Sequence, residues 1–100
     1  MTVMMLRYQV TEEGAAEVAA AAKSVFATLD ADQPKGLHYA YGRLADGDFV
    51  ALMELDEGVD NPLFGIEAAR ALQATIAKWV VGDAPTPQPL DLLGSYGLFG

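Results

Sequence analysis

The stretch GLHYAYGRLADGDFVALMELD, residues 36 to 56, decides the fold of this chain. Its Asp46-Gly47 pair lies between two runs of alternating side chains, and an Asp-Gly pair in that position is a strong signal for a β-hairpin. With this pair at the tip, His38 falls opposite Leu55. The sequence therefore predicts two antiparallel strands joined by a tight turn.

The predicted pairing gives the hairpin two faces of different character. One face is apolar and narrow, and it holds His38, Ala40, Gly42, Phe49, Ala51, Met53 and Leu55. The other face is mixed, and it holds Tyr39, Tyr41, Arg43, Val50, Leu52 and Glu54. Because apolar side chains occur on both faces, the sheet needs cover on both sides.

The flanking segments complete a regular order of elements. Residues 2–10 alternate as a strand. Thr11 then offers a hydroxyl N-cap, and helical spacing follows from residue 12 to about residue 29. Asn61-Pro62 begins a second helix that extends to residue 80, and residues 90–99 alternate as a last strand. The order is β-α-β-β-α-β.

This order predicts one domain, residues 1–100, with a ferredoxin-like α+β fold. Right-handed crossovers place both helices on one face of a four-stranded antiparallel sheet, so the other face lacks a cover. The simplest cover is a second copy of the same sheet, and we therefore predict a homodimer. Its predicted interface consists of Met5, Arg7, Tyr39, Tyr41, Leu52 and Glu54, with an ion pair between Arg7 and Glu54 at the interface.

Charge and composition exclude several classes of partner. The 14 acidic and 6 basic residues give a formal charge of −8, which disfavours nucleic acid and anionic membrane surfaces. The absence of cysteine excludes disulfides and thiol catalysis. No secretory signal or membrane-spanning run is visible, so the sequence predicts a cytoplasmic protein.

The element order, the length, and the stretch FVALMEL (Phe49 to Leu55) before a helix led by Asn61-Pro62 resemble a known family. This is the antibiotic biosynthesis monooxygenase (ABM) domain of the dimeric α/β barrel superfamily. The closing LGSYGLF, residues 93–99, resembles the last strand of small members of that group. The resemblance implies sheets packed face to face in a dimer and a ligand pocket between sheet and helices. It also implies a relationship to cofactor-free oxygenases of polyketide or quinol-like aromatics, to haem-degrading enzymes, and to members without known activity.

His38 is the single histidine, so any imidazole general base has to be this residue. The predicted pairing places it on the helix-facing side, and the alternative is a structural histidine that bonds a carbonyl group. The predicted substrate pocket consists of Tyr8, Phe49, Met53, Phe64, Trp79 and Tyr96. Core packing is the alternative interpretation of these side chains.

The sequence predicts no cofactor and no metal site. The second helix has no histidine to ligate haem, and the acidic loop at Asp56, Glu57 and Asp60 lacks the spacing of a calcium loop. Two hypotheses remain for function. The protein is a cofactor-independent monooxygenase acting on a small aromatic or polyketide-type compound, or a non-catalytic homodimer that binds a small apolar ligand or serves as an interaction module.

Overall fold

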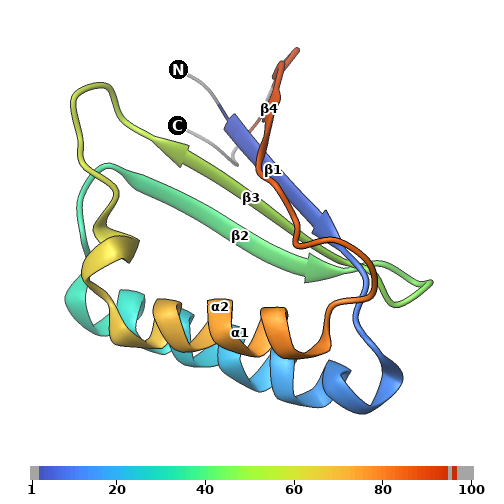
Figure 1. The fold of residues 1–100 in the computed structure, drawn as a ribbon. Coiled ribbons are helices and arrows are strands. Elements are labelled where there is room, and N and C mark those ends of the chain that lie inside the picture. Colours follow the sequence, from blue (N-terminus) through green and yellow to red (C-terminus); the bar gives the residue numbers. More distant parts are fainter. Residues whose placement is uncertain (1–2, 95, 97–100) are drawn as a thin grey trace.

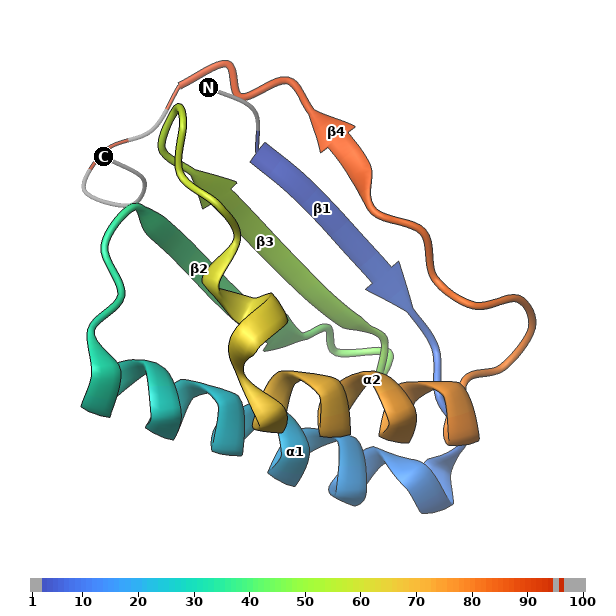
Figure 2. The ribbon, with the colours of Figure 1, turned by 60° about the vertical axis from the view of Figure 1, so that its left-hand side comes forward.

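The computed structural model describes residues 3–94 and 96 of the 100-residue chain. The elements in order are β1 (Val3–Tyr8), α1 (Glu12–Asp32), β2 (Leu37–Arg43), β3 (Phe49–Leu55), the 3-10 helix η1 (Pro62–Gly65), α2 (Glu67–Trp79) and β4 (Gln88–Leu90). The strands form one antiparallel sheet in the order β2-β3-β1-β4. Both helices lie side by side on one face of this sheet (Figures 1 and 2). The predicted ferredoxin-like fold is confirmed.

The core lies between this helix-facing side of the sheet and the two helices. Its buried cluster consists of Tyr8, Val10, Val18, Ala22, Val25, Phe49, Leu72 and Ile76. Val18 and Val25 of α1 are almost fully buried, and Leu72 and Ile76 of α2 retain only 3% exposure each. Burial of each such aliphatic side chain stabilises the fold by about 1.5–3 kcal/mol.

The helix starts follow the predicted capping residues. The Thr11 hydroxyl accepts a hydrogen bond from the Gly14 N–H (3.2 Å), and the Asn61 side chain accepts one from the Leu63 N–H (3.0 Å). The segment after Asn61 is not one continuous helix, because Ile66 adopts an extended conformation between η1 and α2. None of the helices in the described part of the chain is long and apolar enough to span a membrane.

The register of the β2–β3 hairpin differs from the predicted one. The structure pairs Arg43 with Phe49 and His38 with Glu54, because the connection from Leu44 to Asp48 contains an odd number of residues. The Gly47 N–H bonds the Leu44 carbonyl (2.9 Å), and Gly47 has a φ of 97°, which glycine adopts without strain. A shift of one residue moves every side chain of β2 to the opposite face.

This shift corrects the predicted position of three β2 residues. Tyr39 and Tyr41 face the helices and pack against the core, and Tyr39 stacks on Phe26 of α1 with ring centroids 5.1 Å apart. The prediction that both tyrosines lie at a dimer interface is therefore wrong. His38 shares the opposite, outer face with Glu54, and its predicted helix-facing position is also wrong.

The last strand also differs from its prediction. β4 is the short segment Gln88–Leu90, in which Leu90 pairs with Val3 and Pro89 with Met4 of β1. Proline is tolerated there because β4 is an edge strand. Residues 91–94, expected to belong to the strand, are not in a strand. The remainder of the predicted strand includes positions 95 and 97–99, which lie outside the described residues.

Candidate functional site

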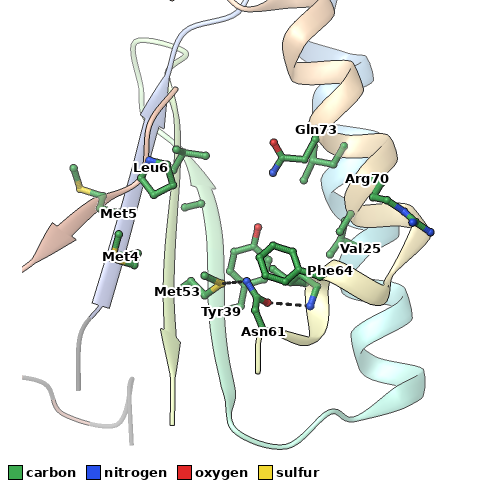
Figure 3. A pocket seen from close by; sticks show the side chains of 15 residues that line it. Met4, Met5, Leu6, Val25, Tyr39, Met53, Asn61, Phe64, Arg70 and Gln73 are labelled. Carbon is green, nitrogen blue, oxygen red and sulfur yellow. Dashed lines mark hydrogen bonds between the residues drawn. The ribbon is translucent and has the colours of Figure 1, made fainter. Parts of the chain in front are cut away.

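A cavity of about 520 Å³ lies between the helix-facing side of the sheet and the η1–α2 segment (Figure 3). Its wall is mostly apolar, and it is lined by Met4, Met5, Leu6, Val25, Tyr39, Ala51, Met53, Asn61, Leu63, Phe64, Ala69, Arg70, Leu72, Gln73 and Pro87. Alanines at positions 51 and 69 present only methyl groups from β3 and α2. These small side chains leave room for the cavity between two elements that each contribute to the core.

Polar groups reach this cavity from three directions. Figure 3 shows the Tyr39 hydroxyl and the Gln73 amide directed into the space between sheet and α2, whereas the Arg70 guanidinium points away from it. Asn61 is fixed at the lower edge, because its oxygen accepts from the Leu63 N–H (3.0 Å) and its amide nitrogen contacts the Met53 sulfur (3.9 Å). The cavity therefore offers a few hydrogen-bonding groups in an apolar enclosure.

The tyrosines beside the cavity are neutral at physiological pH. Burial, with the nearby Tyr8, raises the pKa of Tyr39 to about 12. Burial also raises the pKa of Tyr41, and the hydrogen bond between the Tyr41 and Tyr8 hydroxyls raises it further. Tyr39 can therefore donate a hydrogen bond to a ligand oxygen, and it does not serve as an anionic base near neutrality.

The structure brings two of the six predicted pocket residues to the cavity. Met53 lies on its sheet side, and Phe64 of η1 lies at its mouth with 80% exposure. Tyr8 and Phe49 are buried in the core, where their rings stack 5.6 Å apart, and they do not line the cavity. Tyr96 is fully exposed. The predicted pocket positions of Tyr8, Phe49 and Tyr96 are wrong.

Trp79 is also placed elsewhere than predicted. It ends α2, and its side chain lies against Gly14 in the first turn of α1, while its indole N–H donates to the Glu17 carboxylate. The Lys78 ammonium lies 4.9 Å from the centre of its ring. Trp79 therefore joins the two helices and forms no part of the cavity wall.

His38, the predicted general base, lies outside this cavity. Its Nε2 atom is 3.1 Å from the Asp56 Oδ1 atom on the outer side of the hairpin. Glu54 is the residue directly opposite His38 on the neighbouring strand β3. One ligand atom each of His38, Glu54 and Asp56 lies within 4.8 Å of the others. This cluster is not anticipated from the sequence, because spacing along the chain does not reveal pairing across strands.

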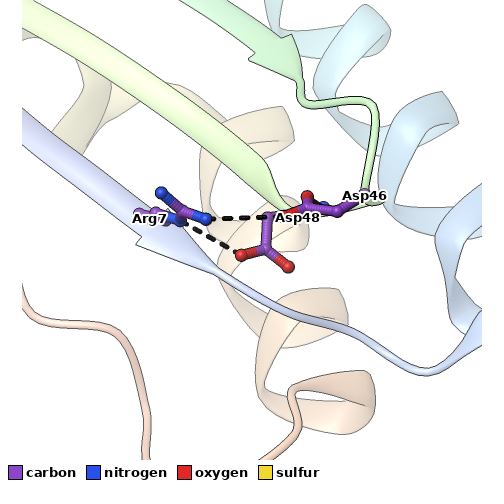
Figure 4. Close-up of polar contacts among 3 residues, drawn as sticks. All are labelled: Arg7, Asp46 and Asp48. Atoms are coloured by element: carbon purple, nitrogen blue, oxygen red, sulfur yellow. Dashed lines mark hydrogen bonds and ion pairs between the residues drawn. The ribbon is translucent and has the colours of Figure 1, made fainter.

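Arg7 and Glu54 share the outer face on neighbouring strands, as expected, but they do not pair within the chain. Arg7 lies opposite Val50, and its guanidinium binds the hairpin turn, with Nε 3.1 Å from an Asp48 oxygen and Nη2 3.5 Å from an Asp46 oxygen (Figure 4). Glu54 lies opposite Val3 at the other end of β1. The exposed Arg7 pairs contribute about 1 kcal/mol or less.

Several cavity residues were missed by the sequence-based interpretation. Sequence patterns identify Asn61 only as the start of a helix and assign Tyr39 to the wrong face. They do not single out Leu72 or Gln73. The composition of η1 was the available signal for this site, since an Asn-Pro start followed by Leu63 and Phe64 brings a polar amide and two large apolar side chains together.

Comparisons with known proteins extend only to the fold. No protein-family model and no curated protein matches this chain. The chain is similar in structure to the NE2512 protein of Nitrosomonas europaea, a protein of unknown function known from a crystal structure. The TM-score is 0.69 at 19% sequence identity, and the match covers 99% of this chain and 95% of that one. This similarity supports the ferredoxin-like fold.

Proposed function

We propose that this protein binds a small aromatic or similarly apolar molecule in the cavity between the sheet and α2. The cavity itself is the observation on which the proposal depends. Its volume of about 520 Å³ falls within the range of about 300 to 1,000 Å³ that is usual for small-molecule sites. A mostly apolar wall with a few directed polar groups is the ordinary composition of such sites.

The lining suggests how a ligand would be held. A flat ring would lie between Met53 on the sheet side and Leu72 on the helix side, with Phe64 across the mouth. The Tyr39 hydroxyl, neutral because its pKa is raised to about 12, would donate to a ligand oxygen. The Gln73 amide would supply a second polar contact from α2.

The test is a binding screen with a matched pair of variants. We expect two- and three-ring phenols and quinols to raise the melting temperature and to give saturable binding by calorimetry. Ala69→Phe fills the cavity from α2 and should abolish this binding. Ala74→Phe adds the same ring at an exposed position of α2 outside the lining and should leave it unchanged. Equal binding by both variants would refute the cavity as the site.

We further propose that the protein is a homodimer with an ABM-like arrangement, in which the outer faces of two sheets pack together. Both helices lie on the other face, so no described helix covers the outer one (Figure 1). Met5, Val50 and Leu52 are partly exposed there. Tyr39 and Tyr41 are no part of this proposed interface, and Met5, Arg7 and Leu52 remain from the predicted set. Glu54 lies on the same face but is already buried within the single chain, so it is not part of the proposed contact.

Cofactor-independent oxygenation is a second candidate function, favoured by a mostly apolar cavity with a hydroxyl donor in its wall. An activated CH₂ group of a bound polyketide-type substrate would supply the electrons and react with O₂. One oxygen atom would form a new C=O group and the other would leave as water. Tyr39 would stabilise the oxygen of the substrate that becomes electron-rich during this reaction.

Oxygen consumption with an activated quinol or anthrone tests this candidate. Tyr39→Phe should slow turnover by about tenfold or more, since a single hydrogen-bond donor to a developing oxyanion is worth about 100-fold in known enzymes. His38→Ala should leave turnover unchanged, because His38 lies on the other face of the sheet. Loss of turnover in His38→Ala with an unaffected Tyr39→Phe would refute this assignment.

A further inference from the structure

Three side chains with metal-ligand chemistry lie together on the outer side of the hairpin, away from the cavity. His38 is near the start of β2, Glu54 lies opposite it on β3, and Asp56 follows the end of β3. The His38 Nε2 and Asp56 Oδ1 atoms are 3.1 Å apart, and a Glu54 carboxylate oxygen lies within 4.8 Å of both ligand atoms. The register of the hairpin alone brings these residues together.

Glu54 supplies a second, independent observation. The residue is only 4% exposed, and its Oε1 atom has no hydrogen-bond partner among the residues that the structure describes. Buried carboxylates in folded proteins are normally paired with a cation, hydrogen-bonded or bound to a metal ion. Glu54 is therefore a buried carboxylate with an unpartnered oxygen, and its side chain also lies close to an imidazole and a second carboxylate, which indicates a cation ligand.

We propose that His38, Glu54 and Asp56 bind one divalent transition-metal ion. Two carboxylates balance the charge of the ion, and the neutral imidazole favours zinc, manganese, iron or cobalt over calcium and magnesium, which prefer oxygen ligands alone. Ligand atoms on such an ion, with bonds of about 2.1 Å, lie about 3.0 to 3.4 Å apart. The separation of His38 and Asp56 already matches this value, and Glu54, which lies within 4.8 Å of them, would move closer on binding the ion.

The exposure of the three ligands fits an ion that enters from solvent. The side chains of His38 and Asp56 are 35% and 50% exposed, while Glu54 is buried. Three protein ligands leave at least one coordination position for water or for an anionic group of another molecule. The site is therefore open in the manner of exchangeable or catalytic metal sites.

Titration calorimetry on chelator-treated protein tests the proposal. The protein must carry no polyhistidine tag, because His38 is the single histidine of the chain. We expect ZnCl₂, MnCl₂ or CoCl₂ to bind at one ion per chain. Loss of a residue that supports a metal ligand lowers metal affinity by about 10- to 100-fold. Glu54→Gln and Asp56→Asn remove ligands themselves, so each should weaken binding by at least this factor.

Asp60→Asn is the matched control, since Asp60 belongs to the same acidic loop and is no member of the cluster. Its affinity should equal that of the wild type. Circular dichroism checks the folding of each variant. If Glu54→Gln does not fold, the metal affinity of His38→Gln tests the proposal instead. Absence of binding for all three ions, or equal affinity in His38→Gln and Asp60→Asn, would show that the cluster holds no metal.

Discussion

Glu54 is a charged residue in a strand whose other members are apolar or uncharged. Its carboxylate is buried at the junction of β3, β2 and β1, and one of its oxygens has no partner among the described residues. Removal of a carboxylate from water without full pairing costs several kcal/mol. In metal-free protein, Glu54 is therefore expected to lower the stability of the fold.

Replacement of this residue gives a prediction for stability. Glu54→Leu should raise the free energy of unfolding of chelator-treated protein by about 1–3 kcal/mol, because a leucine of similar volume needs no partner. Urea denaturation measures the change, with the exposed Glu57→Leu as control. A loss of stability in Glu54→Leu would mean that the carboxylate is well paired in the native state.

The buried tyrosines predict how stability changes at alkaline pH. The pKa of Tyr39 rises from 10.0 to about 12 on folding, so its stabilising contribution is complete below pH 10 and is lost as the pH rises toward 12. Tyr41 acts in the same direction. The free energy of unfolding of Tyr39→Phe should therefore fall less between pH 9 and 11 than that of the wild type, as measured by urea denaturation at each pH. An equal fall in both proteins would count against burial of this hydroxyl.

Residues with local roles were the ones that the sequence predicted well. Thr11 and Asn61 cap their helices as expected, because a cap depends only on the next two or three residues. The roles of His38 and Tyr39 depend on the face of the sheet to which each side chain points. That face is set by the hairpin connection, so both residues were assigned incorrectly.

At the scale of elements, the hairpin shows how one residue of loop length changes a site. The strands themselves were predicted from their alternation, and the parity within β1 and β3 is confirmed by their register. The Asp46-Gly47 signal does not distinguish a connection with an even number of residues from the observed one. The side chains of β2 were therefore placed on the wrong face, with the histidine toward the helices and the tyrosines away from them.

The contact between the two helices rests on Gly14. A Cβ atom at this position would overlap the Trp79 side chain, so the close approach of α1 and the end of α2 requires glycine. The indole hydrogen bond to Glu17 fixes the Trp79 ring in this place. This contact explains why a tryptophan at a helix end lies against the neighbouring helix, away from the cavity.

Gly14→Ala should therefore destabilise the protein by about 1–3 kcal/mol, the usual cost of overpacking. The helix propensity of alanine alone would instead stabilise by about 1 kcal/mol. Chemical denaturation distinguishes the two signs, and Trp79→Leu in the same chain should restore most of the loss. Gly42→Ala, where nothing lies within 4 Å of the added carbon, is the control. A stabilised Gly14→Ala protein would contradict the described packing.

At the scale of the whole molecule, the order of elements was predictable because periodicity, caps and right-handed crossovers leave few alternatives. The position of the last strand was not predictable. Pro89 lies within it, and the alternation of the residues after Pro89 suggested a strand that begins later. The cavity was predicted only as a general location. The wall of the cavity depends on where η1 ends and α2 begins. The extended conformation of Ile66 sets this boundary, and no sequence pattern predicted it.

The proposed dimer gives a prediction at this scale. Sedimentation velocity at micromolar concentration should show a dimer, and Leu52→Glu should dissociate it, because two unpaired carboxylates would be buried at the contact. Leu44→Glu, in the hairpin loop and already 41% exposed, is the control. A wild-type protein that sediments as a monomer would exclude an interface through the outer face.

A crystal structure of the complex with the tightest ligand from the aromatic screen tests the central claim most directly. We predict ligand density between the sheet and α2, in contact with Met53 and Leu72 and with an oxygen in hydrogen-bonding distance of the Tyr39 hydroxyl. Density at any other place, with the cavity free of ligand, would contradict the claim that this cavity is the functional site.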